Sequence, residues 1–335
     1  MSFISIAKCI VSTSGLICLI NFCFSCAEKP SEEIPIHQLK VIQSFDQLDT
    51  FYLSDVRSID YSDGHYYISD YFESKIFKVD ERNNLETFIG DVGRGPGELL
   101  EVSKFYIDNS TLLIMDSPNQ SIKIFNKNGD FVKSIVSDQF QMKGNSRFSF
   151  RNGILFLPNY SNSYLSLMYN VLTNSVEYIG KLENVKSIDY ASHILTSKDR
   201  VIILPLASPK AYSYDMNGNL VESKDFSGIA PIEEFMRFHN IYPSQPDGQS
   251  FYVMTVDATL HKEDLYILYL TLNDENKTVA NSILKCEVYE DEIVAKELIN
   301  LGEGDFSCFN FGPECLVAYD QLNGKIKIFE YDNTK

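Results

Sequence analysis

The hydrophobic positions of this chain fall into short runs with strand-like alternation, and the runs come in pairs. Residues 64–70 (GHYYISD) and 74–80 (SKIFKVD) form one pair, joined by a short polar connection. The same arrangement returns at residues 112–130 and 316–329, and the first run of each copy ends on an aspartate, namely Asp70, Asp116 or Asp320. Short β-branched and aromatic runs bounded by turn residues predict strands, and their recurrence predicts a repeat protein built from β-sheet.

Weaker copies fill the middle of the chain, so that the first runs end at positions 70, 116, 158, 205, 269 and 320. The intervals of 46, 42, 47, 64 and 51 residues give six units, with an insertion in the fourth interval. A unit of this length, with two central strands and a strand-like run on either side, is typical of a four-stranded propeller blade. The first blade is expected to use residues 56–61, 66–70, 74–80 and 85–89. A β-sandwich is the alternative, but sandwiches do not repeat at this interval.

The two ends of the repeat region complement each other. The sixth unit stops after its third strand, whereas residues 38–42 (QLKVI) alternate like a strand but precede the first unit. Pairing of 38–42 with the last unit would close the ring and remove an open sheet edge. The predicted fold is therefore all-β, a six-bladed β-propeller over residues 38–335 closed by its N-terminal strand, with residues 26–37 as a tether.

The first 25 residues differ from the rest. They carry a single charge, Lys8, and an apolar stretch too short to span a membrane comfortably, which is the layout of a secretory signal. The small residue Ser25 before Cys26 resembles a bacterial lipobox, which predicts a lipoprotein signal peptide over 1–25 and a lipid anchor on Cys26. Cys23 stands where such signals usually have leucine, and an ordinary cleaved signal or an uncleaved anchor are the alternatives.

Charge and cysteine content narrow the possible functions. The chain has 46 acidic and 29 basic residues, a formal charge of −17, and no basic stripe, so we expect no nucleic-acid partner. Cys286, Cys308 and Cys315 remain in the body without a Cys-x-x-Cys motif, which favours free thiols over a disulfide framework or a zinc site; a Cys308–Cys315 bridge is the alternative. The five histidines show no metal-binding spacing, and no motif predicts a cofactor.

Two recurring features are expected to be structural. The glycines of residues 90–97 lack the Gly-Lys-Ser/Thr of a phosphate-binding loop and are expected to link two blades. The aspartates at the strand ends are expected to accept backbone hydrogen bonds in the turns that follow rather than to bind calcium, because one per blade would be too far apart to share an ion.

These patterns resemble those of NHL-type blades and of the six-bladed, TolB-like propeller lipoproteins of Gram-negative bacteria. The resemblance rests on residues 89–99 (IGDVGRGPGEL) and on the Tyr-Ile-x-Asp motif, which is followed by a closing Asn-Gly-Asp turn. It covers most of residues 39–335, strongly over the first, second and sixth blades. It implies a propeller fold and a lipoprotein of the cell envelope, anchored to the outer membrane, but no reaction, because the family is defined by its architecture.

One set of residues is a candidate ligand site. The start of each innermost strand lies about twelve residues before the end of the second strand and lines the channel. The residues at these positions are Arg57, Lys104, Arg147, His193, Asp257 and Cys308. Three cations and a histidine on consecutive blades would form a positive mouth able to hold a carboxylate, phosphate or sulfate. In the alternative, each cation pairs with a neighbouring acid such as Asp60 or Asp108 and binds no ligand.

The insertion in the fourth interval is the other irregular feature. Residues 231–239 (PIEEFMRFH) have proline at a helix-start position, acids in the first turn and apolar residues on one face, which predicts a short helix. Arg237 and His239 in this segment and Tyr242 in the following loop are further candidate ligand-binding residues, because loops on rigid scaffolds often carry function. Alternatively, the helix plugs one end of the channel.

We therefore expect a lipid-anchored binding or scaffold propeller. Its expected partners are the membrane, through the anchor, and a glycan, a small anionic ligand or an envelope protein. The alternative is a propeller enzyme, such as a lyase, lactonase or glycosidase, with its site at one mouth of the central channel. An enzyme would need two carboxylates, or a carboxylate and a histidine, converging within catalytic reach.

Overall fold

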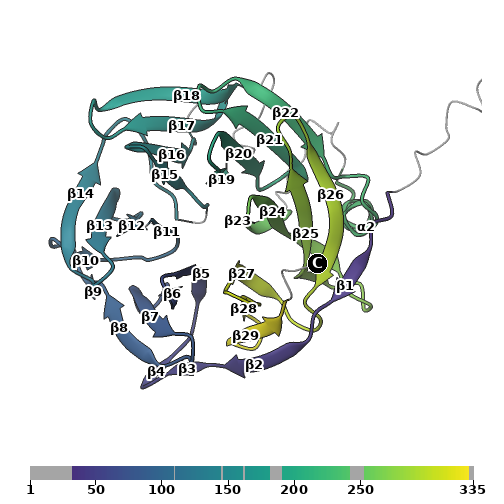
Figure 1. The fold of residues 1–335 in the computed structure, drawn as a ribbon, viewed down its shortest axis with the longest axis horizontal. Helices are drawn as coiled ribbons and strands as arrows, with labels where there is room; N and C mark the ends of the chain where they lie inside the picture. Colours follow the sequence, from purple (N-terminus) through teal and green to yellow (C-terminus); the bar gives the residue numbers. More distant parts are fainter. Residues whose placement is uncertain are drawn as a thin grey trace, which may run out of the picture. The chain divides into compact units, whose positions relative to one another are not determined.

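Six small sheets, arranged in a ring around a central axis, make up the fold (Figure 1). The structure, a computed structural model, describes residues 32–108, 110–144, 146–160, 163–181, 191–241 and 253–331. All its strands belong to one compact unit, Glu33–Lys335. The predicted all-β, six-bladed β-propeller is confirmed.

Blades 1, 2 and 3 each contain four antiparallel strands in chain order from the channel outward. Blade 1 consists of β5 (Val56–Ser62), β6 (His65–Asp70), β7 (Lys75–Asp80) and β8 (Leu85–Ile89). Blade 2 consists of β11 (Phe105–Ile107), β12 (Thr111–Asp116), β13 (Ser121–Asn126) and β14 (Phe131–Val136). Blade 3 consists of β15 (Ser149–Arg151), β16 (Ile154–Pro158), β17 (Tyr164–Asn170) and β18 (Ser175–Lys181). The strands of blade 1 match the predicted ones to within a residue at either end.

Blades 5 and 6 contain strands from the beginning of the chain, whereas blade 4 does not. Blade 4 consists of β19 (Ser192–Thr196), β20 (Arg200–Pro205), β21 (Lys210–Asp215) and β22 (Leu220–Asp225). Blade 5 consists of β23 (Thr255–His261), β24 (Asp264–Leu272), β25 (Thr278–Val288), β26 (Ile293–Asn300) and, outermost, β1 (Ile36–Gln38). Blade 6 consists of β27 (Phe306–Phe311), β28 (Cys315–Asp320), β29 (Lys325–Glu330) and β2 (Val41–Phe45).

The predicted ring closure is confirmed, with the closing strand a few residues later than expected. β2 pairs antiparallel with β29, with Val41 opposite Phe329 and Phe45 opposite Ile326. The predicted tether over 26–37 overlaps the sheet, because β1 begins at Ile36 and pairs parallel with β26, with Ile36 opposite Leu298. The open edge of β26 offers unpaired backbone groups, which recruit an exposed segment that lacks an apolar pattern of its own.

The aspartates that end the second strands hold the following turns, as predicted. Asp70 Oδ2 accepts a hydrogen bond from the Ser54 backbone N (2.8 Å), and its Oδ1 accepts one from the Phe72 backbone N (3.1 Å). In blades 2 and 6 the equivalent carboxylates accept hydrogen bonds from an asparagine Nδ2 three residues later, at 2.6 and 2.7 Å. All three aspartates are fully buried, so these donors replace the water that the carboxylates lose.

Glycine is required in the link between blades 1 and 2. This link contains the short parallel strands β9 (Asp91–Val92) and β10 (Glu98–Leu99). Gly90 has φ of +94°, and a Cβ there would lie 2.3 Å from Leu99 Cδ1. Any other residue would therefore be both strained and in collision with the core. The expected linking role of these glycines is confirmed.

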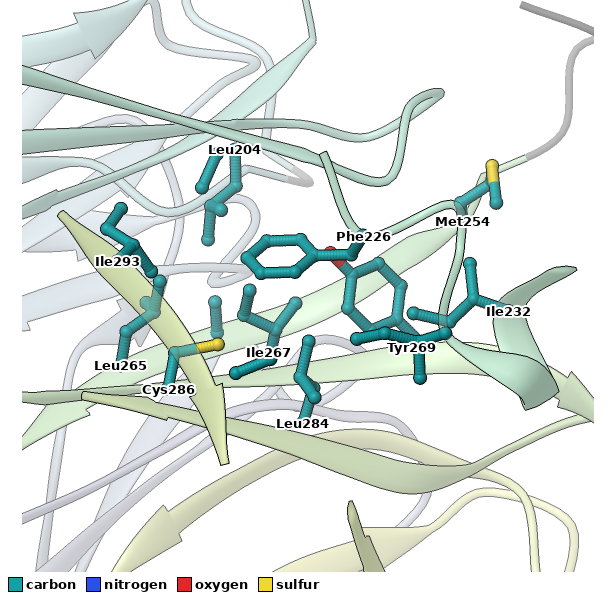
Figure 2. Close-up of a cluster of buried hydrophobic side chains, with 14 of the residues drawn as sticks. Leu204, Phe226, Ile232, Met254, Leu265, Ile267, Tyr269, Leu284, Cys286 and Ile293 are labelled. Carbon is teal, nitrogen blue, oxygen red and sulfur yellow. The ribbon is translucent and has the colours of Figure 1, made fainter. Parts of the chain in front are cut away.

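The hydrophobic core lies between neighbouring blades. Between blades 4 and 5 it includes Leu204, Phe226, Ile267 and Leu284 (Figure 2). The helix α2 (Ala230–Phe238) adds its buried residues to this cluster; these are Ile232, Phe235 and Met236. The predicted helix is thus present, and Figure 1 shows it at the outer side of the ring rather than at the channel. The expectation of a channel plug is wrong, because the apolar face of α2 is complementary to the gap between two blades.

A small hairpin of β3 (Gln47–Leu48) and β4 (Phe51–Tyr52) connects β2 to blade 1.

Candidate functional site in the axial channel

Four of the six residues predicted to line the channel meet at the axis. Lys104, Arg147, His193 and Asp257 come from blades 2, 3, 4 and 5, and together they are called the axial cluster here. Each is at most 6% exposed. They converge because each lies within two residues of the start of an innermost strand, and all innermost strands surround the same axis.

The Asp257 carboxylate lies at the centre of the axial cluster. Its Oδ1 accepts hydrogen bonds from Arg147 Nε (2.7 Å) and Lys104 Nζ (3.1 Å). Its Oδ2 accepts hydrogen bonds from Arg147 Nη2 (2.8 Å) and from the Phe309 backbone N (3.2 Å). Two donors on each oxygen use the hydrogen-bonding capacity of a carboxylate.

Further hydrogen bonds extend the axial cluster to the remaining blades. Lys104 Nζ also donates to the Arg57 carbonyl oxygen in blade 1 (2.5 Å), and Arg147 Nη2 donates to the Phe309 carbonyl oxygen in blade 6 (3.3 Å). The Arg147 backbone N donates to His193 Nδ1 (3.1 Å). The cluster therefore connects all six blades across the axis.

The pKa shifts of the axial cluster follow from burial and from its own charges. Burial alone would raise the pKa of Asp257, but the charges of Arg147 and Lys104 hold it well below its ordinary value. Burial lowers the pKa of His193 to about 3, so the imidazole is neutral near pH 7. The cluster thus holds two cations and one anion.

This arrangement differs from the positive mouth expected from the sequence. The side chains of Lys104 and Arg147 are paired, and their partner is Asp257, a member of the same predicted ring, rather than Asp60 or Asp108. Cys308 lies close to the cluster, and burial raises the pKa of its thiol to about 12. The three described cysteines, Cys286, Cys308 and Cys315, are free thiols.

A second carboxylate, Asp60, lies further along β5 in the same channel. Its Oδ1 accepts a hydrogen bond from Asn310 Nδ2 (2.8 Å), which also donates to the Ile59 carbonyl oxygen (3.0 Å). Asp60 lies deep among protein atoms yet keeps part of its surface in contact with solvent. Burial raises its pKa to about 6, and the Arg147 charge opposes this rise.

Comparison with known families identifies the fold family. A family model described as a 6-bladed beta-propeller (DUF5128) matches residues 47–226, more than half of the chain. The chain belongs to this family. No curated protein matches its sequence.

Solved structures similar to this propeller include two from Bacteroides. A Bacteroides fragilis protein named as exported has a TM-score of 0.57 at 15% identity, covering 89% of this chain and 99% of the other. A duf4221 family member from Bacteroides vulgatus has a TM-score of 0.59 at 12% identity, covering 87% of this chain and 97% of the other. Virginiamycin B lyase from Staphylococcus aureus, in a catalytically inactive form with quinupristin, has a TM-score of 0.53 at 11% identity, with 86% and 98% covered. At these identities, the likeness shows the fold alone.

Arg57 is the predicted channel cation whose side chain lies apart from the axial cluster. Its Nε and Nη2 each donate to the Asp55 carboxylate at 2.6 Å. Its guanidinium lies 4.9 Å from the centre of the Tyr71 ring, a cation–π contact. The Asp55 pair raises the pKa of Arg57 against the effect of burial. Only the main-chain carbonyl of Arg57 contacts the cluster in this propeller.

The candidate residues of the inserted helix lie away from the channel. Arg237 is exposed in the last turn of α2, and His239 follows the helix as its C-cap residue. His239 Nε2 lies 2.8 Å from Thr278 Oγ1, and its ring packs against Phe235. The structure therefore does not bring these residues to the axial cluster. Tyr242 and the predicted lipid anchor Cys26 lie outside the described residues.

Sequence reasoning named Asp60 only as a possible partner for a cation. The strand register carries a signal that would have found it. Three residues of the innermost strands share one register position: each lies opposite the residue that stands three positions before the aspartate ending the second strand. They are Asp60 opposite Tyr67, Tyr106 opposite Leu113, and Asn310 opposite Val317.

Across the described ranges of this propeller, no group of histidine, cysteine or carboxylate side chains is placed to hold a metal ion, and no helix is long and apolar enough to cross a membrane.

Proposed function

We propose that this chain is an exported lipoprotein of the bacterial cell envelope, anchored to the outer membrane through Cys26, that acts as a binding or scaffold module. The apolar N-terminal segment with a small residue before Cys26 supports the anchor. The fold shared with a protein named as exported is consistent with this location. The propeller would then be the part that meets a ligand or partner.

The hydrogen bonds that Asp257 already accepts are the main support for a binding function rather than a catalytic one. A carboxylate and a histidine do converge at the axis, but Asp257 already accepts four hydrogen bonds. His193 accepts one at Nδ1 and is neutral. A general base needs a free lone pair within reach of a substrate proton, and this buried carboxylate offers none. The axial cluster is therefore suited to bracing the ring.

Among the expected ligands, a small anion has the least support from the geometry. Both cations of the axial cluster are buried and already face Asp257, so an incoming anion would have to displace this carboxylate. Arg57 is likewise paired with Asp55. A glycan or an envelope protein remains the better-supported ligand class.

The anchor is tested by Cys26→Ser in the full-length protein expressed in a Gram-negative host. Wild-type protein should fractionate with the outer membrane and incorporate labelled fatty acid, and Cys26→Ser should lose the label. Cys18→Ser is the matched control, because it removes a thiol from the same segment but outside residues 23–26, and it should keep the anchor. Wild-type protein without label, or label that persists in Cys26→Ser, would show that the proposed anchor is wrong.

A further inference from the structure

A second level of polar side chains lies next to the axial cluster, toward the ends of the innermost strands. Asp60 in β5, Tyr106 in β11 and Asn310 in β27 share one register position in three consecutive blades. Arg151 ends β15 in the next blade. These four residues are called the second-level site here. Asp60, Tyr106 and Arg151 are half-buried, so solvent reaches this level of the channel.

The two carboxylates of the channel, Asp257 and Asp60, differ in the hydrogen bonds that they accept. Asp257 accepts four hydrogen bonds and is completely buried. Asp60 accepts a side-chain hydrogen bond from Asn310 and a backbone hydrogen bond from Tyr61, so its donors are two neutral amides. Its neighbour Arg147 is committed to Asp257. A carboxylate in this state has spare acceptor capacity that a ligand could use.

A donor also remains unused beside Asp60. Burial raises the pKa of Tyr106, the carboxylates of Asp108 and Asp60 add to the rise, and the Arg151 charge opposes it, so the phenol lies among these charges. In the described part of the chain, Arg151 Nε is buried without a hydrogen-bond partner, and Tyr106 is half-buried. Buried donors of this kind are normally paired, by protein, water or ligand.

The charges around this level are balanced. Three cations, Lys104, Arg147 and Arg151, face three carboxylates, Asp257, Asp60 and Asp108. A balanced site gives no net attraction to an anion or a cation. It favours a neutral ligand that both donates and accepts hydrogen bonds. The Tyr106 ring packs against the hydrophobic cluster between blades 2 and 3, which holds the phenol in place.

We propose that the second-level site binds a neutral carbohydrate ring, with Asp60 accepting hydrogen bonds from ligand hydroxyls and Tyr106 and Arg151 donating to ligand oxygens. Asn310 holds the Asp60 carboxylate in place and is a positioning residue. This inference rests on the proposed binding function and names its ligand class. It places the ligand in the channel, apart from Arg237 and His239 on the outer side of the ring.

The test is titration calorimetry of the full-length protein, in a detergent without a sugar headgroup, with the methyl pyranosides of glucose, galactose, mannose and xylose. Saturable binding of at least one, with Kd of about 1 mM or tighter, is expected. Asp60→Asn keeps the size of the side chain and should weaken this binding at least about tenfold, because a hydrogen bond to a charged acceptor is lost. Asp291→Asn is the control: it removes the same charge from an exposed turn of blade 5 and should leave Kd unchanged.

A pH series adds a measurement that a structural effect would not reproduce. The groups around Asp60 are the charges of Arg147 and Asp257, the phenol of Tyr106, and two amide donors, the Asn310 side chain and the Tyr61 backbone. Protonation of Asp60 removes an acceptor, so affinity should fall as pH drops through about 6, whereas Asp60→Asn should show no such fall. Tyr106→Phe, which removes only the hydroxyl, should weaken binding several-fold.

Three outcomes would overturn the inference. They are no saturable binding of any of the four pyranosides, equal affinity in wild type and Asp60→Asn, and inorganic phosphate binding more tightly than the sugars without dependence on Asp60. None of them affects fatty-acid labelling at Cys26, so a failure of this inference is distinguishable from a failure of the proposed anchor.

Discussion

At the scale of single residues, the channel holds two carboxylates in opposite states. Cationic neighbours hold the pKa of Asp257 down despite its burial, whereas burial raises that of Asp60 to about 6. The difference lies in the donors: Asp257 receives both cations of the axial cluster, and Asp60 receives neutral amides. One carboxylate therefore stabilises the ring, and the other is available for a ligand.

Asp257→Asn should lower the free energy of unfolding by about 3–5 kcal/mol, because it leaves two buried cations without their counter-ion. Urea unfolding of the full-length protein at pH 7 measures this loss. Adding Lys104→Met to the variant should restore part of it, since one unpaired charge is then removed.

The matched control for this prediction is Asp225→Asn. Asp225 pairs with Lys210 at 3.6 Å on the surface, so its loss should cost less than about 1 kcal/mol. If Asp257→Asn and Asp225→Asn lowered the free energy of unfolding equally, the axial cluster would not stabilise the ring as proposed.

Asp60→Asn should stabilise the protein at neutral pH and not in acid. The folded pKa of about 6 exceeds the ordinary value of 3.8, so the folded state binds the proton more tightly, and wild-type stability rises as pH falls through this window. The variant should therefore be more stable than wild type by about 1–3 kcal/mol at pH 7, and the difference should vanish near pH 4. Urea unfolding at the two pH values measures it, and a less stable variant at pH 7 would contradict the prediction.

At the scale of elements, strand pairs and turns follow local sequence closely. β6 and β7 are joined by a turn that Asp70 holds, and Asp320 acts in the same way between β28 and β29. The closing strand β2 is different, because its partner β29 lies near the other end of the chain. Its position depends on an edge that exists only once blade 6 has formed.

Replacing Gln43 and Ser44 together by proline should destabilise the closed ring. Successive residues of a strand point their N–H groups to opposite sides, so at least one of the two faces β29 and is lost. We expect a loss of about 2–3 kcal/mol in urea unfolding. Faster amide hydrogen exchange in β29 than in wild type should accompany it.

Glu33→Pro is the control for the proline variant, because it lies on the exposed, non-strand segment before β1. It should leave both measurements unchanged. If the double proline variant also matched wild type, the pairing of β2 with β29 would not be what closes the ring.

At the scale of the whole molecule, the axial cluster and the closing strand hold the ring from inside and outside. Lys104 and Arg147 reach Asp257 across the axis, while β2 completes the rim of blade 6. The cores between blades supply the burial, as the cluster in Figure 2 does between blades 4 and 5. A ring braced in this way is a rigid support for a binding site in its own channel.

The sequence by itself determined the blades, because strands, turns and their repeat interval depend on residues close together along the chain. It also predicted four residues that meet at the axis, since equivalent positions in a ring converge, but it placed the Arg57 side chain there as well, which pairs with Asp55 instead. Only the tertiary structure decided that Asp257 neutralises Lys104 and Arg147, that Asp60 is left with neutral amide donors, and that α2 lies outside the ring. Pairing between residues more than 100 positions apart depends on distances in space, which the repeat interval does not contain.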